Sequence, residues 1–203
     1  MQLNTEKTLD VERIKYTGTP VLCVLGCLMN DLGKRIKQEM VEWISEKYDI
    51  VAVNQEYPGK MFEFPGLAMA QTASITLHKP VLYLHTKGAF NTNTIYSQEN
   101  VRKLWKREFI DNYDYYFGKV SGSGAAVACP FTGSFNRTTW MNGFVANEAA
   151  WSSIPRFESS YDRFPYEHTF IHAGIPVYGR IMNNVNFWPS RESQKMVNFI
   201  NSI

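Results

Sequence analysis

The sequence has little excess charge, few cysteines and no long apolar run. Its 203 residues include 21 Lys and Arg against 19 Asp and Glu, which gives a formal net charge of +2. That is too small to indicate a surface for nucleic acid. The longest apolar run, Val21 to Met29, is far shorter than the roughly 20 residues that cross a bilayer. We therefore expect no nucleic-acid partner and no transmembrane segment, while peripheral contact with a membrane stays open.

Three cysteines, Cys23, Cys27 and Cys129, are an odd number that does not indicate a disulfide framework. Two of them lie in the apolar run, which favours buried, reduced thiols. No other Cys or His stands near them at the spacing of metal ligands. The first ten residues lack the basic start and apolar core of a secretory signal. These features together predict a cytoplasmic protein.

Two glycine-rich motifs for nucleotides are also absent. The segment Gly26 to Gly33 lacks the second glycine of Gly-x-Gly-x-x-Gly, and its first glycine lies inside an expected strand. No Gly-x-x-x-x-Gly-Lys-Ser/Thr loop occurs anywhere in the chain. The sequence therefore disfavours dinucleotide-dependent oxidoreductases and P-loop enzymes.

Strand and helix patterns alternate along the chain with short connections. This order predicts one α/β domain over 1–203, with a mostly parallel central sheet and helices on both faces. Residues 1–15 show weak periodicity and are expected to be peripheral. The expected strands are 21–28, 50–53, 81–84, 125–129, 140–145 and 177–181, and the expected helices are 31–48, 66–78, one beginning near Ser97 with an apolar stripe to Tyr116, 147–154 and 166–172.

Polar residues follow three of the expected strands, at the end of a sheet where ligands bind in open α/β folds. Asn30 follows the first strand and Gln55 the second. The third is followed by His85, Thr86, Lys87 and Gly88. Lys87 is a cation suited to phosphate, and the glycine gives a ligand room near the backbone. The alternative is a solvent-exposed turn in which the lysine has no ligand-binding role.

These residues resemble a known family. His85-Thr86-Lys87-Gly88 stands where the small bacterial GT-A-type nucleotide-sugar glycosyltransferases have Asp-x-Asp after an apolar strand, and it is similar to a bacterial group with His-Thr/Ser-Lys-Gly there. That group has a Trp-Arg pair on the next helix, where this chain has Trp105-Lys106-Arg107. The segments 131–135, 139–146 and 163–168 also resemble the family.

The resemblance implies a Rossmann-like GT-A domain and a hexosyltransferase that acts in surface-polysaccharide synthesis. Its donor would be a nucleotide diphosphate sugar, a UDP-sugar as first choice, and its acceptor a carbohydrate. In this interpretation Lys87 and His85 meet the diphosphate, and Glu167 is the catalytic base, with Asp162 as its substitute. The remaining residues expected to bind substrate are Thr86, Gly88, Asn30, Gln55, Trp140, Asn142, Gly143 and Arg163.

Several alternatives stay open. Glu167 and Arg163 could equally form a structural salt bridge, and Trp140 could equally be a core residue. Lys87 predicts a metal-free site, but a divalent cation (manganese or magnesium) is the competing possibility. His168 and His172, spaced i, i+4, favour structural roles over a metal site. A non-catalytic protein that binds nucleotide sugars or carbohydrates is the alternative function, and a hydrolase is a third.

Overall fold

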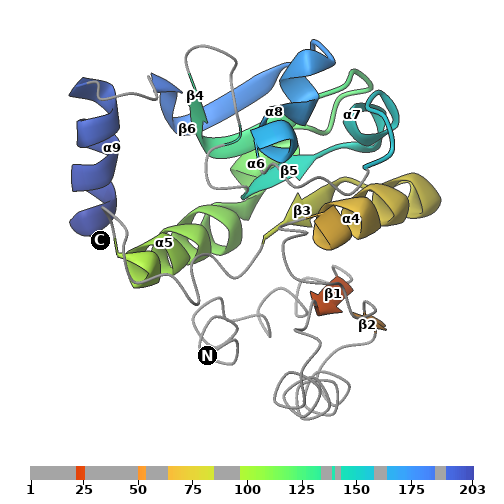
Figure 1. Cartoon of the computed structure of the whole chain (residues 1–203), viewed down its shortest axis with the longest axis horizontal. Coiled ribbons are helices and arrows are strands. Elements are labelled where there is room, and N and C mark those ends of the chain that lie inside the picture. The colour runs from red at the N-terminus through yellow and green to blue at the C-terminus, as the bar shows by residue number, and fades with distance from the viewer. Residues whose placement is uncertain are drawn as a thin grey trace.

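The computed structural model describes residues 22–25, 50–53, 64–84, 97–133, 139, 143–157, 164–185 and 191–203. Strands and helices are interspersed along this part of the chain, as Figure 1 shows. The elements are β1 (Leu22–Leu25), β2 (Ile50–Val53), α4 (Phe64–Leu77), β3 (Val81–Tyr83), α5 (Gln98–Trp105), the π-helix η1 (Lys106–Asp111), α6 (Tyr113–Lys119), β4 (Val127–Gly133), β5 (Phe144–Ala146), α7 (Glu148–Ser152), α8 (Phe164–His172), β6 (Val177–Val185) and α9 (Arg191–Asn201).

The main sheet has four strands in the order β3-β5-β4-β6. β5 is antiparallel to both of its neighbours, and only β4 and β6 form a parallel pair. The expectation of a mostly parallel sheet is therefore wrong, although the mixed α/β class is confirmed. The physical reason lies between β4 and β5. Only ten residues, 134–143, separate β4 from β5, whereas a parallel pair needs a connection of about a dozen residues or more.

A second, two-stranded sheet is formed by β1 and β2. These strands pair in parallel with the register Leu22↔Ile50 through Leu25↔Val53, so the ends that lead toward Asn30 and Gln55 are neighbours. The strand predicted over 50–53 is confirmed with the same bounds. Among the described strands, neither β1 nor β2 pairs with β3.

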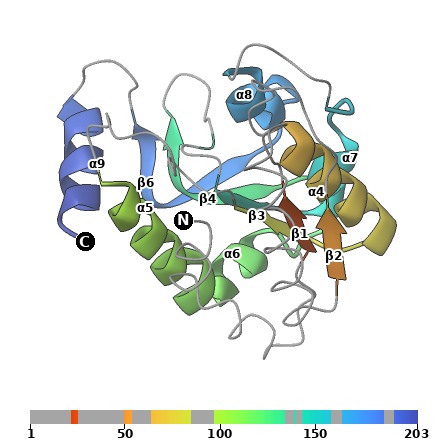
Figure 2. The same ribbon diagram turned by 60° about the horizontal axis from the view of Figure 1, so that its bottom comes forward.

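Each face of the main sheet is covered by its own layer of helices. Alternate residues of β4 point to opposite sides: Ala128 packs in one cluster with Trp105, Tyr116 and Met196 of α5, α6 and α9. Cys129 packs in the other cluster, which contains residues of α4, α7 and α8. Figure 2 shows α5, α6 and α9 along one side of the sheet and α4 on the other. Helices on both faces are confirmed.

The helix predicted from Ser97 is divided into three segments in the structure. Ser97 is the N-cap of α5, and its Oγ accepts a hydrogen bond from Asn100 N at 3.3 Å. The chain then widens into η1 before it continues as α6. Such π segments are rare and occur frequently at functional sites. None of the described helices has the length and apolar composition that a membrane crossing requires.

Candidate functional site

The candidate site is the end of the main sheet where β3, β4 and β6 finish and β5 begins, here called the carboxyl edge. β5 is antiparallel to β3 and β4, so its first residue lies beside the last residues of β3. The register pairs Tyr83 with Phe144. Leu84, which leads into His85-Thr86-Lys87-Gly88, and Gly143, which follows Asn142, therefore extend from neighbouring strand ends. The two motifs that the sequence singled out join the described fold at the same place.

Most of the predicted site residues lie outside the described part of the chain. Gly143 is described, and Glu167 lies on the described backbone of α8. The residues outside the described ranges are His85, Thr86, Lys87, Gly88, Asn30, Gln55, Trp140, Asn142, Asp162 and Arg163. Their predicted roles stay predictions.

Gly143 is held against the indole of Trp105. A Cβ at this position would lie 2.7 Å from Trp105 Nε1 and 3.1 Å from Phe109 Cε2, and distances below 3.0 Å require one of the groups to move. Gly143 is buried, and Trp105 is 1% exposed. Trp105 is therefore a core residue. The same contact places α5 directly against the start of β5.

α8, which contains Glu167, approaches β5 from the opposite face of the sheet. The ring of Phe170 lies with its centroid 5.2 Å from that of Phe144, the first residue of β5. Glu167 precedes Phe170 by three residues, roughly 4.5 Å along a helix axis. Helices from both faces therefore meet β5 where the carboxyl edge begins.

A second described residue at the carboxyl edge is Thr139, which immediately precedes Trp140. Thr139 forms an isolated antiparallel bridge with Thr132, near the end of β4. Its side chain is buried, and its Oγ1 has no hydrogen-bond partner within the described structure. A buried hydroxyl without a partner is unusual in proteins. Sequence patterns cannot identify such a group, because threonines are common at strand ends.

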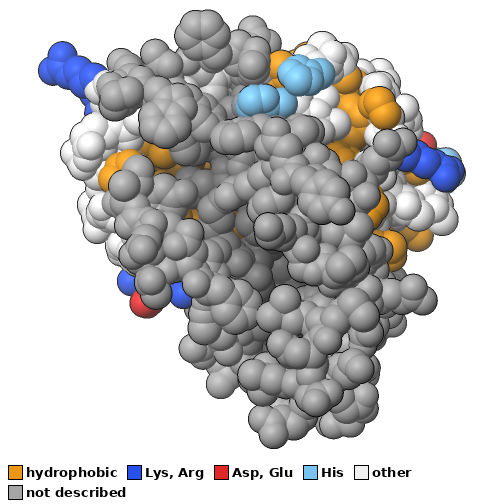
Figure 3. Space-filling view, viewed as in Figure 1, with side chains coloured by type: hydrophobic (Ala, Val, Ile, Leu, Met, Phe, Trp, Pro, Cys, Tyr) orange, Lys and Arg blue, Asp and Glu red, His pale blue; other side chains and the backbone are white. Residues whose placement is uncertain are grey.

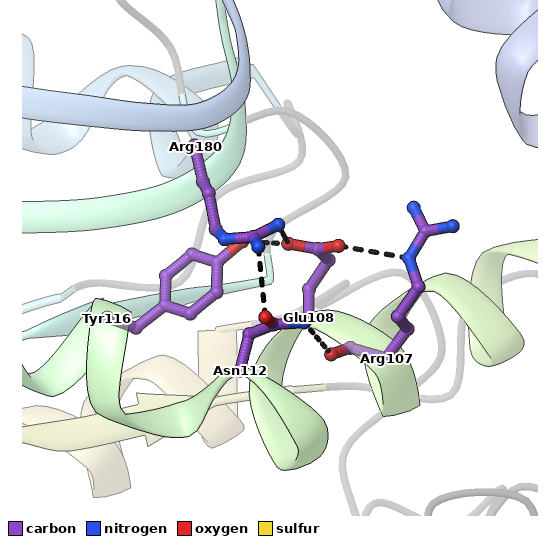
Figure 4. A network of polar contacts seen from close by, with 5 residues as sticks. All are labelled: Arg107, Glu108, Asn112, Tyr116 and Arg180. Carbon is purple, nitrogen blue, oxygen red and sulfur yellow. Dashed lines mark hydrogen bonds and ion pairs between the residues drawn. The ribbon is translucent and has the colours of Figure 1, made fainter.

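A polar network that no sequence pattern indicated lies on the face covered by α5, η1 and α6 (Figure 4). Its centre is the buried carboxylate of Glu108. Oε2 accepts hydrogen bonds from Arg180 Nη1 and from the Tyr116 hydroxyl, each at 2.8 Å. Oε1 accepts from Arg107 Nε at 3.1 Å. Three donors on two carboxylate oxygens satisfy a charge that would otherwise be costly to bury.

Asn112 extends this network to the backbone. Its Oδ1 accepts a hydrogen bond from Arg180 Nη2 at 2.9 Å, and its Nδ2 donates to the Arg107 carbonyl at 2.7 Å. Asn112 directly follows the π-helix. The network therefore connects the end of η1 to β6 and stabilises their packing.

The environment of Tyr116 keeps its phenol protonated. Burial is the main cause that raises the pKa of Tyr116, and the hydrogen bond to Glu108 raises it further. The hydroxyl therefore serves as a fixed donor to the carboxylate. Tyr116 is fully buried, so its hydroxyl is not exposed to solvent.

Metal-binding patterns in the sequence find no support in the described residues. Asp111 and Asp114 are both exposed. His168 and His172 do share one side of α8, with ring centroids 5.8 Å apart. Figure 3 shows histidine side chains gathered over this helix. Within the described part of the chain, no three His, Cys, Asp or Glu side chains form a group that could hold a metal ion.

Comparison of the chain with protein-family models, with curated proteins and with solved structures finds no match. The function must therefore be argued from the residues themselves.

Proposed function

We propose that the protein is a glycosyltransferase that moves a sugar from a nucleotide diphosphate sugar to a carbohydrate acceptor in surface-polysaccharide synthesis. The observation that supports this most directly is the register of β3 and β5. It makes neighbours of the strand end that leads into His85-Thr86-Lys87-Gly88 and the strand start that follows Trp140-Met141-Asn142. A cationic motif and a sugar-binding motif would need this proximity to act on one substrate.

In the proposed reaction the bond from the sugar to the diphosphate breaks through an oxocarbenium-like state, and negative charge develops on the diphosphate. Lys87 and His85 stabilise this charge, which lowers the barrier. Glu167, or Asp162 in its place, accepts the proton of the acceptor hydroxyl if the transfer inverts the sugar. Trp140, Asn142 and Gly143 shape the sugar pocket, and Arg163 is a further substrate contact. Thr86, Gly88, Asn30 and Gln55 hold the nucleotide.

The proposal is tested by incubating the protein with a panel of radiolabelled nucleotide sugars, UDP-sugars first, with and without carbohydrate acceptors. Transfer to an acceptor supports the proposal. Release of free sugar without transfer supports a hydrolase. Nucleotide binding without either product supports the alternative of a non-catalytic binding protein.

Lys87→Ala should reduce turnover about 10²–10³-fold, as the loss of one donor to a transition-state charge typically does. The matched control is Lys79→Ala, because Lys79 is exposed and lies just before the opposite end of β3. Activity should persist in EDTA, since Lys87 occupies the place of a metal-binding acidic motif. If EDTA abolishes activity, manganese restores it and Lys87→Ala is nearly silent, a divalent cation fills this role instead.

A further inference from the structure

An arginine on α5, Arg102, has no hydrogen-bond or ion-pair partner among the described residues, although part of it is buried. Arg102 Nε is inaccessible to solvent and makes no hydrogen bond. Within the described structure its guanidinium takes part in no ion pair either. Guanidinium groups in proteins are normally satisfied when buried, because the desolvated donor otherwise costs free energy. A guanidinium whose Nε is buried without a partner among the described residues is a candidate contact for a ligand.

Neighbouring carboxylates cannot account for Arg102. Glu99, three residues earlier, forms an ion pair with Lys103 at 3.9 Å. Glu108, the next carboxylate along the chain, is occupied by Arg107 and Arg180. Lys106, one turn after Arg102, has no ion-pair partner in the described structure. Two positive charges, one on α5 and one at the start of η1, therefore lie close together without an ion-pair partner among the described residues.

The position of α5 directs these charges toward the carboxyl edge. Arg102 precedes Trp105 by three residues and Lys106 by four, so all three lie on one side of the helix. Trp105 contacts Gly143 at the start of β5. Leu82 and Leu84, at the end of β3, pack against the cluster that contains Val101 and Trp105. The side of α5 that carries Arg102 therefore borders the strand ends from which the two site motifs extend.

We infer that Arg102, assisted by Lys106, is a second cationic contact for the diphosphate of the donor. This assignment depends on the proposed function for the identity of the ligand. A planar guanidinium can donate two parallel hydrogen bonds to phosphate oxygens, which a lysine cannot do. Arg102 would therefore orient the diphosphate, while Lys87 supplies a point charge. The nucleotide and the sugar play no part in this contact.

The inference is tested by calorimetric titration of the full-length protein with inorganic pyrophosphate and, separately, with UDP. Arg102→Ala should weaken both interactions about 10–100-fold, the effect of losing one or two charge-assisted hydrogen bonds. Arg102→Lys should recover only part of the loss, since it restores the charge without the paired donors. Lys103→Ala is the matched control, because Lys103 is exposed and paired with Glu99; it should bind both ligands as the wild type does.

Stability separates a ligand contact from a structural role. Arg102 makes no hydrogen bond with the described residues, so Arg102→Ala should melt at or above the wild-type temperature in the absence of ligand. Unchanged affinity for pyrophosphate in Arg102→Ala, or no binding by the wild type, overturns the inference whatever the transfer assay shows. Arg102-dependent binding of pyrophosphate without binding of UDP or transfer of sugar supports the anion site and overturns the proposed function alone.

Discussion

Replacing Asn147 by alanine should destabilise the protein by about 3–5 kcal/mol, more than any exposed substitution. Asn147 is buried, and its side chain makes five hydrogen bonds. Oδ1 accepts from Ala150 N at 2.9 Å, as the N-cap of α7, and from Ala126 N at 3.1 Å. Nδ2 donates to the carbonyls of Val120, Gly122 and Gly124. One side chain thus fixes α7, the turn after α6 and the residue before β4.

The magnitude follows from these bonds. Loss of an N-cap typically costs about 1 kcal/mol. A buried amide without an acceptor, here Ala126 N, costs about 1–3 kcal/mol more. The Val120 carbonyl also loses a donor in a buried place, whereas the carbonyls of Gly122 and Gly124 belong to exposed residues that water can reach. For a chain of this length, the sum corresponds to a melting temperature lower by about 6–20 °C.

The two functions of the Asn147 amide can be separated. Asn147→Asp keeps the acceptor that caps α7 but replaces the donor by a carboxylate beside three carbonyl oxygens, so at pH 7 it should also be clearly destabilised. Urea unfolding followed by circular dichroism measures both variants. Asn198→Ala is the control, since Asn198 is exposed and its side chain accepts one bond from Gln194 within α9. An alanine variant within 1 kcal/mol of the wild type would refute this reasoning.

Three further predictions concern single residues of the core. Gly143→Ala should lower the free energy of unfolding by about 1–3 kcal/mol, because it forces Trp105 aside, and should shift tryptophan fluorescence. Gly118→Ala, with open space around the glycine, should do neither. Equal stability of both variants would contradict the packing argument. The pKa of Tyr116 is raised in the folded state, so the folded protein retains a proton that the unfolded chain loses above about pH 10, and stability should fall as pH rises above 10. Tyr116→Phe should reduce that fall in urea unfolding measured at alkaline pH. An unchanged dependence of stability on pH in the variant would contradict this prediction. Cys129 is a free, buried thiol whose pKa burial raises, so iodoacetamide at pH 8 should alkylate it only after unfolding, and rapid native labelling in peptide maps would contradict this.

The helices with a clear apolar stripe could be predicted from the sequence. Val101, Leu104 and Trp105 fall at helical spacing after a serine N-cap, and all three are buried. The π-helix could not be predicted, because its one added residue per turn hardly changes the apolar pattern of the sequence. That added residue nevertheless places Glu108 on the buried face of the helix. α9 was not predicted at all. Its buried apolar residues, Met196, Val197 and Ile200, form a short stripe among polar residues.

Strand bounds were harder to predict where local preferences disagree with pairing. The strand expected over 125–129 is β4, which continues to Gly133 through Pro130. Proline normally ends or borders a strand because it lacks an N–H. Here the register between β4 and β6 shifts between Cys129 and Phe131, so Pro130 lies at an irregularity that does not need a regular ladder bond. β6 similarly continues past the predicted end at 181 to Val185.

The candidate site could be predicted only as short motifs. The sequence identifies His85-Thr86-Lys87-Gly88 and Asn142-Gly143, but their proximity depends on β5 pairing with β3. That pairing joins segments far apart in the chain, and no local pattern determines it. No sequence pattern singles out Arg102, because its lack of a partner among the described residues is visible only in three dimensions.

The arginines around α5 and η1 have different roles: Arg107 and Arg180 form ion pairs with Glu108, whereas Arg102 does not. Arg107 and Arg180 donate to Glu108 from two elements, and Arg180 also donates to Asn112. Their bonds hold η1 against β6. Removing either would leave a buried carboxylate short of donors, so neither is free to bind an anion without a cost to the fold. Arg102 has no comparable structural role among the described residues. The nearest carboxylates along the chain, Glu99 and Glu108, already form ion pairs with other residues. Because Arg102 has no hydrogen-bond or ion-pair partner among the described residues, a bound phosphate is the partner to test.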